Sequence, residues 1–176
     1  MVYGIANTLL SILWLKESEP WPRKGSWGTR KNRQEGRCRL VRILVADDNP
    51  AVRNFLRSLL EQQSNWQVCD QVPTGGEALQ RVKENQPDLI LLDFQMPDLN
   101  GVEVAREIAR LSPEIPILMV TIHPSKQLIE EARKTGIRGV CAKWDVGSIV
   151  DAVSALLRQE TYFPQTISAG PLSLDS

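Results

Sequence analysis

The chain has 176 residues, with 21 Lys and Arg, 21 Asp and Glu and one His, so its formal net charge is zero. This balance hides an asymmetry, because residues 1–42 carry a net charge of +6 and the other 134 residues a net charge of −6. The apolar fraction of 42% and the charged fraction of 24% exclude a wholly disordered chain and favour a single domain with one or two tails.

Residues 1–39 precede any regular pattern, and we predict that they form a basic, disordered N-terminal extension. The apolar run Val2–Leu15 is interrupted by polar residues and is shorter than the roughly 20 residues that span a membrane. It also lacks the flanks of a secretory signal. The three cysteines are widely spaced and form no CxxC pair, so they indicate neither a disulfide framework nor a zinc site. We therefore expect a soluble cytoplasmic protein with no membrane partner.

From residue 40 onward, strand-like apolar runs alternate with helical patterns. The first run, Leu40–Ala46, is apolar and β-branched. Asn49 is then placed to cap a helix, with Pro50 at its first position, where a missing N–H costs nothing. The apolar residues that follow have the i, i+3, i+4, i+7, i+8 spacing of an amphipathic helix: Val52, Phe55, Leu56, Leu59 and Leu60.

The same alternation continues to residue 158. Further strands are predicted at Trp66–Val72, Asp88–Phe94, Ile115–Ile122 and Arg138–Ala142, and further helices at Gly75–Glu84, Val102–Leu111, Pro124–Lys134 and Val146–Arg158. Five strand–helix repeats predict an α/β fold with an open parallel sheet and helices on both faces. Residues 160–176 contain two prolines and a glycine and are predicted to be a flexible C-terminal tail.

Chemically active side chains stand at the ends of four predicted strands: Asp47 and Asp48, then Asp93, Thr121 and Lys143. In open parallel sheets, ligands bind at the carboxyl ends of the strands. Three close carboxylates favour a hard divalent cation such as Mg²⁺, and one of them can act as a nucleophile that forms an acyl phosphate. The hydroxyl and the ammonium are suitable donors to a new phosphoryl group.

Between about Leu40 and Gln159 the sequence resembles the receiver domain of bacterial response regulators. The resemblance is carried by Asp47-Asp48, by LLDFQMPDLNG (Leu91–Gly101), by Val120-Thr121 and by Ala142-Lys143. It implies a receiver domain over residues 40–159. It also implies a doubly wound, five-stranded parallel sheet in the flavodoxin-like order 2-1-3-4-5, with five helices.

The resemblance also implies a role for each site residue. Asp93 would accept a phosphoryl group from a sensor histidine kinase or a phosphotransfer protein, without activity on external substrates. Mg²⁺ would be held by Asp47, Asp48, Asp93 and the backbone carbonyl of Gln95. Thr121 would bind a phosphoryl oxygen and shift inward, and Lys143 would pair with the phosphate.

Signalling surfaces follow from the same resemblance. Kinase docking would use Asn49–Gln62 and Trp144–Gly147. Output would use the fourth helix, the fifth strand and the fifth helix, roughly Pro124–Arg158, by contact with another protein or by phosphorylation-dependent homodimerisation.

Three residues depart from the family pattern. Ile122 follows Thr121 where a small residue is usual, Val140 replaces the rotating aromatic of the fifth strand, and Trp144 follows Lys143 where Pro is common. We hypothesise that Ile122 slows phosphoryl loading and loss, while Gln95 and His123 tune water access. Apart from that role, His123 is interpreted as a surface-loop residue.

Each site residue also has an ordinary structural interpretation. Asp47 and Asp48 can belong to a helix cap, Asp93 to a turn, Thr121 to a strand, and Lys143 to a solvated surface. Because independent accidents would have to coincide at four strand ends, we favour the functional interpretation.

The basic extension has three interpretations: a segment that binds nucleic acid or anionic lipid, a tail with no binding role, or a stretch that is not translated. We favour the third, because residues 41–48 look like the usual beginning of a receiver and no Met occurs between Met1 and Met96. The alternative function is a DNA-associated transcriptional regulator. It would either use the basic arm or lack a C-terminal helix-turn-helix, for which the eighteen residues after Arg158 leave no room. Nucleic acid is not expected to bind the receiver itself.

Overall fold

The structure, a computed structural model, describes residues 39–164. The predicted extension, apart from residue 39, and the last twelve residues of the predicted tail lie outside the described range. Strands and helices alternate along the chain: β1 (Val41–Ala46), α1 (Pro50–Leu60), β2 (Trp66–Val72), α2 (Gly75–Asn85), β3 (Leu89–Asp93), α3 (Gly101–Leu111), β4 (Ile117–Thr121), α4 (Lys126–Thr135), β5 (Gly139–Ala142) and α5 (Val146–Leu157).

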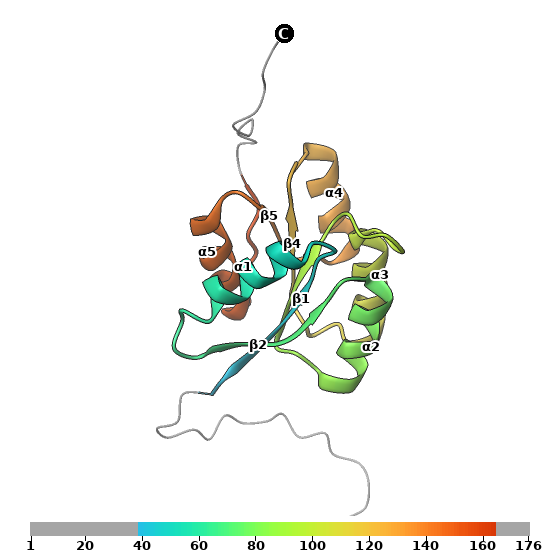
Figure 1. The fold of residues 1–176 in the computed structure, drawn as a ribbon. Coiled ribbons are helices and arrows are strands. Elements are labelled where there is room, and N and C mark those ends of the chain that lie inside the picture. The colour runs from blue at the N-terminus through green and yellow to red at the C-terminus, as the bar shows by residue number, and fades with distance from the viewer. Residues whose placement is uncertain (1–38, 165–176) are drawn as a thin grey trace, which may run out of the picture. The chain divides into compact units, whose positions relative to one another are not determined.

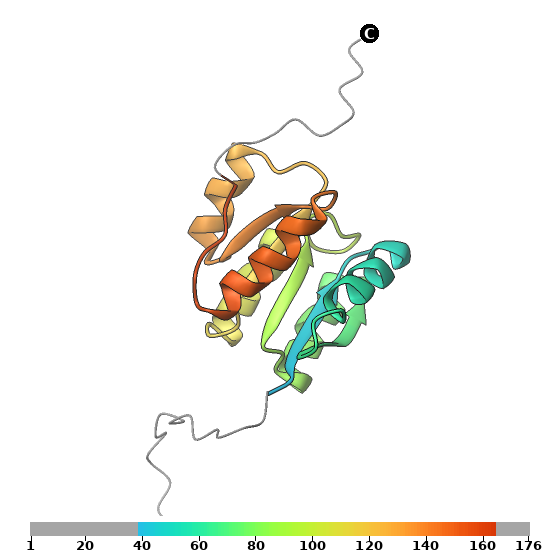
Figure 2. The same ribbon diagram turned by 90° about the vertical axis from the view of Figure 1, so that its left-hand side faces the viewer.

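The five strands form one parallel sheet in the order β2-β1-β3-β4-β5. Helices α1 and α5 cover one face, and α2, α3 and α4 cover the other (Figures 1 and 2). Each layer buries its own apolar cluster against the sheet. The predicted fold class and strand order are therefore confirmed.

The central strands are buried on both faces. All five residues of β3 (LILLD) and of β4 (ILMVT) are buried, as expected for parallel strands between two helical layers. β4 begins at Ile117 rather than at the predicted Ile115. The reason is that the Ile115 N–H bonds to the carbonyl of Ser112 and the next residue, Pro116, has no N–H to donate.

Side-chain caps determine where the helices begin, next to the carboxyl edge of the sheet. Asn49 caps α1 through a bond from the Ala51 N–H at 2.9 Å, with Pro50 at the first position, as predicted. Ser125 caps α4, so this helix begins at Lys126 and not at Pro124. Caps of this kind satisfy N–H groups that the helix itself leaves unpaired.

Residues 160–164 are the part of the predicted flexible C-terminal tail that the structure describes. Tyr162 donates its N–H to the carbonyl of Arg138 and accepts from the N–H of Val140, each at 2.9 Å, so it pairs with the free edge of β5. Phe163 packs on the core, and the guanidinium of Arg133 on α4 lies 3.9 Å from its ring centroid. Within the described residues, the two aromatic side chains and the open strand edge supply contacts that hold Tyr162 and Phe163 against the domain.

Over residues 39–164, no helix is long and apolar enough to span a bilayer.

Candidate functional site

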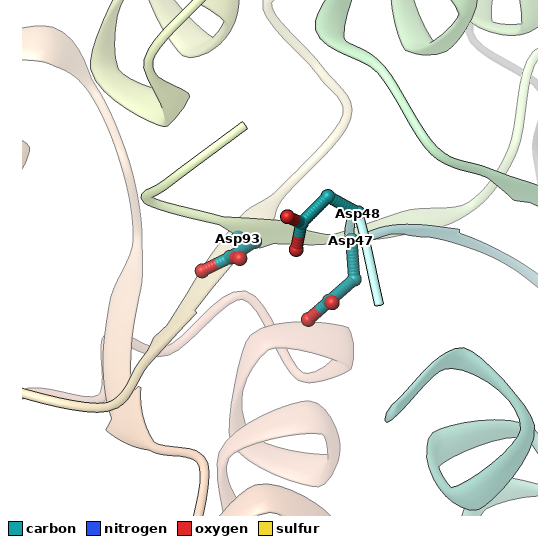
Figure 3. Close-up of side chains that lie close together, drawn as sticks. All are labelled: Asp47, Asp48 and Asp93. Carbon is teal, nitrogen blue, oxygen red and sulfur yellow. The ribbon is translucent and has the colours of Figure 1, made fainter. Parts of the chain in front are cut away.

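Three aspartates meet where β1 and β3 end. Asp47 and Asp48 directly follow β1, and Asp93 is the last residue of β3. One carboxylate oxygen from each lies within 4.8 Å of the others, and Figure 3 shows the three side chains together at the edge of the sheet. Asp47 and Asp93 are 1% and 4% exposed, whereas Asp48 is open to solvent. Two carboxylates of the cluster are thus buried, and the third is accessible from solvent.

Lys143 reaches the same place from the end of β5. Its Nζ donates to Oδ2 of Asp47 at 2.6 Å and to Oδ2 of Asp93 at 2.8 Å. One ammonium among three carboxylates leaves an excess of negative charge when all are ionised. The site is therefore suited to a further cation.

The environment changes the pKa of both partners of this ion pair. Burial raises the pKa of Asp93, and the Asp47 carboxylate adds to this, while the hydrogen bond and charge of Lys143 and the N–H of Gln95 oppose it. Burial alone would lower the pKa of Lys143, but hydrogen bonds and charges from Asp47 and Asp93 outweigh it and raise that pKa. Lys143 is therefore held as a cation, while Asp93 ionises less readily than an exposed carboxyl group.

Thr121 ends β4 beside this cluster. It is 4% exposed and pairs in register with Ala142, the residue before Lys143. Its carbonyl accepts the Lys143 N–H at 2.8 Å, and its Oγ1 accepts the N–H of His123 at 3.4 Å. The hydroxyl-bearing strand end and the lysine are thus joined through the backbone. His123 is exposed in the following loop, where it was predicted.

The donor atoms match a hard divalent cation. Three carboxylates with an open side can supply oxygen ligands, and Mg²⁺ typically takes one or two carboxylates and keeps several waters. Gln95, whose backbone carbonyl the resemblance adds to this set, lies two residues after Asp93 and has an exposed side chain. The residues present fit Mg²⁺.

Most of the described sequence matches one known protein family. The family model for the response regulator receiver domain matches residues 43–154. This chain belongs to the response regulator receiver family.

Among curated relatives, the transcriptional regulatory protein LnrK of Bacillus subtilis is 33% identical over 135 residues, which are 76% of this chain and 61% of LnrK. The chemotaxis protein CheY of Halobacterium salinarum is 33% identical over 116 residues, 65% of this chain and 95% of CheY. A LuxR-family response regulator from Aurantimonas has a similar solved structure, with a TM-score of 0.68 and 29% identity over 70% of this chain and 89% of that one. The chain spans about three fifths or less of the length of LnrK and two other relatives of the transcriptional-regulator type.

Two departures of this receiver from the family pattern lie in β5 and just after β4. Ile122 is 52% exposed at the rim, directly after Thr121. Val140 is fully buried in the core of the α2–α4 layer, so β5 carries no aromatic side chain that can alternate between buried and exposed positions.

Three further residues support the site, and no role was predicted for them from the sequence. Gly101 belongs to the quoted LLDFQMPDLNG segment; a Cβ there would clash with the carbonyl oxygen of Asp93, and its N–H bonds to the carbonyl of Phe94 at 2.8 Å. Asp98 belongs to the same segment and Arg53 lies on α1; both bond to backbone groups, which are distant in sequence or across a turn, and such partners leave no pattern in the sequence. Only the glycine could have been found, as a residue that permits close approach.

Asp98 joins the β3–α3 loop to the first turn of α2. Its carboxylate accepts the N–H groups of Gly75 at 2.9 Å and Gly76 at 2.8 Å. Slight burial acts to raise the pKa of Asp98, but the backbone N–H groups outweigh it and lower that pKa. The loop that carries Gln95 is thereby attached to the neighbouring helix.

Proposed function

We propose that this receiver accepts a phosphoryl group on Asp93 from a histidine kinase or a phosphotransfer protein, with Mg²⁺ as cofactor. The proposal rests mainly on the buried Asp93 carboxylate, which lies 2.8 Å from the Lys143 ammonium and within 4.8 Å of two further carboxylates. Receivers in general interact with histidine kinases and with output domains. The acceptor is the protein's own side chain, so no external substrate is processed.

The transfer exchanges one bond to phosphorus for another. A carboxylate oxygen of Asp93 forms the new O–P bond, the bond between phosphorus and the donor's imidazole nitrogen breaks, and the leaving imidazole keeps the electron pair. Bound Mg²⁺ would offset the negative charge of the carboxylates and the phosphoryl oxygens. Lys143, which starts as a cation on Asp47 and Asp93, supplies a charge-assisted donor to a phosphoryl oxygen.

Phosphorylation then acts on the face formed by α4, β5 and α5. A phosphoryl group adds charge and acceptor oxygens beside Thr121, whose hydroxyl donates to one of them and draws the end of β4 inward. The bond between the Thr121 carbonyl and the Lys143 N–H joins this movement to the end of β5. Because β5 has no aromatic switch residue, the backbone transmits the population shift. The altered face then binds an output protein or a second copy of the chain.

Intact-mass measurement tests the acceptor assignment. With Mg²⁺ and acetyl phosphate, the wild type should gain one phosphoryl group and Asp93→Asn none. Asp151→Asn is the matched control, because Asp151 is an exposed aspartate on α5, and it should be phosphorylated like the wild type. Equal phosphorylation of Asp93→Asn would refute the assignment.

A second candidate, DNA-associated transcriptional regulation, is supported by the names of the relatives, several of which are transcriptional regulatory proteins. The basic extension that could bind DNA lies outside the described residues. Salt-dependent DNA binding that is lost when residues 1–40 are deleted would support this function. Binding that is unchanged by the deletion, or no binding at all, would oppose a role for the extension.

A further inference from the structure

Arg53, on the first turn of α1, reaches back to the segment that carries two of the three aspartates. Its Nη1 donates to the carbonyl oxygen of Asp47 at 2.7 Å and to that of Asp48 at 3.0 Å. One guanidinium nitrogen therefore holds two consecutive peptide groups. The Arg53 side chain contacts the backbone that bears the carboxylates, and it forms no ion pair with either of them within 4.0 Å.

The other contacts of this segment hold Asp47 more firmly than Asp48. The Asp47 N–H bonds to the carbonyl of Val72 at 3.1 Å, and its carboxylate accepts the N–H of Asn49 at 2.9 Å and pairs with Lys143. Within residues 39–164, the Asp48 carboxylate has no hydrogen bond or ion pair with the protein. Its direction therefore depends on the backbone, and at Asp48 the backbone carbonyl is held by Arg53.

We propose that Arg53 is a positioning residue for the divalent-cation site: by holding the backbone carbonyls of Asp47 and Asp48, it keeps the Asp48 carboxylate directed toward Asp93. This inference rests on the proposed function in one respect, namely that Mg²⁺ binds the three aspartates. Groups that orient metal ligands without binding the metal themselves commonly lower metal affinity by about 10–100-fold when they are removed.

The charge of Arg53 has the opposite effect on a cation. A guanidinium close to the acidic cluster repels Mg²⁺, so if charge dominated, removing it would tighten Mg²⁺ binding. If positioning dominates, removing it weakens binding. The sign of the change in the Mg²⁺ dissociation constant therefore separates the two effects, without any measurement of phosphotransfer.

Mg²⁺ titration of the full chain, followed by calorimetry, tests the proposal. Arg53→Ala should raise the Mg²⁺ dissociation constant by about 10–100-fold. Arg53→Lys should recover much of the affinity, because a single nitrogen makes both bonds and an ammonium has three donors. Arg57→Ala is the matched control: Arg57 lies one turn further along α1 and pairs with Glu61 at the surface, so its loss should leave the constant within about twofold.

Thermal unfolding without Mg²⁺ shows whether each variant is folded. Arg53→Met keeps the aliphatic stem and takes the place of Arg53→Ala if the latter unfolds; it should weaken Mg²⁺ binding to a similar extent. Wild-type or tighter Mg²⁺ binding in a folded Arg53→Ala or Arg53→Met variant would overturn the positioning role and leave the proposed function intact. A wild type that binds no Mg²⁺ would instead refute the cofactor assignment, and the positioning role with it.

Discussion

The Nζ of Lys143 lies 2.8 Å from Oδ2 of Asp93, although the two residues are 50 positions apart in the sequence. They meet because β3 and β5 are parallel strands of the same sheet, so their carboxyl ends lie at one edge. The same ammonium lies 2.6 Å from Asp47. The proposed phosphorylation of Asp93 would therefore rearrange an existing ion-pair network, which would link the chemistry to the conformation of the sheet edge.

The charge of Asp93 should reduce the stability of the metal-free protein. Burial raises the pKa of Asp93 above its unfolded value of 3.8, so the folded state binds the proton more tightly than the unfolded state. Ionisation then costs stability as the pH rises above 3.8, and the full cost is present above the folded pKa. Asp93→Asn removes this cost and should raise the free energy of unfolding at neutral pH.

Urea denaturation in the presence of a chelator, at several pH values from about 4 to about 7, checks this. The stability advantage of Asp93→Asn over the wild type should grow as the pH rises. An advantage that stays constant with pH, or a variant less stable than the wild type at neutral pH, would contradict the raised pKa.

Gly101 should tolerate no side chain. A Cβ at this position would clash with the carbonyl oxygen of Asp93 and crowd Phe94, and these are backbone atoms that cannot rotate away. We expect Gly101→Ala to lower the free energy of unfolding by about 1–3 kcal/mol and to slow phosphorylation of the adjacent Asp93. Denaturant unfolding and the rate with acetyl phosphate measure the two effects.

Gly147→Ala is the control, because a Cβ on this α5 residue meets nothing within 4 Å. Alanine has the higher helix propensity, so this variant should be as stable as the wild type or about 0.5–1 kcal/mol more stable. Equal stability of the two alanine variants would show that the predicted clash is absent.

Ile122 should slow the loss of the phosphoryl group. Its side chain stands half-exposed at the rim of the site, directly after Thr121, where it can obstruct water. Ile122→Ala should dephosphorylate several-fold faster than the wild type, as followed by the decay of the phosphorylated mass. Leu111→Ala, at a similarly exposed residue at the end of α3, should leave the rate unchanged, and a rate for Ile122→Ala no faster than wild type would reject the hypothesis.

The packing of Phe163 should contribute to the stability of the domain. Its ring contacts the core and the guanidinium of Arg133, so Phe163→Ala should lower the free energy of unfolding by about 1–2 kcal/mol. Phe55→Ala removes a ring that is 45% exposed on α1 and should cost less than about 0.5 kcal/mol. If both substitutions cost the same, the segment after α5 does not pack as the structure shows.

The order of elements was predictable because burial on both faces leaves a plain pattern. Runs such as LILLD and ILMVT have no polar interruption until the residue at the strand end. In each amphipathic helix, apolar residues recur at the helical spacing. The pairing of Tyr162 with β5 was not predictable, because it depends on an open strand edge that exists only once the sheet has formed.

The site was predictable to the extent that it depends on strand ends. Asp47, Asp93 and Lys143 were expected to meet, and the structure brings them together. Arg53 and Asp98 were missed, because their partners are carbonyl and N–H groups, which every residue carries and which therefore leave no pattern in the sequence.

The most direct test of the account locates the phosphoryl group on the chain. Protein treated with acetyl phosphate and Mg²⁺ is reduced with borohydride, which converts an aspartyl phosphate to homoserine, and is then mapped by peptide mass spectrometry. We predict homoserine at position 93, dependent on Mg²⁺ and absent at every other aspartate. Homoserine at another aspartate, or none in protein that binds Mg²⁺, would contradict the central claim that Asp93 is the phosphoacceptor.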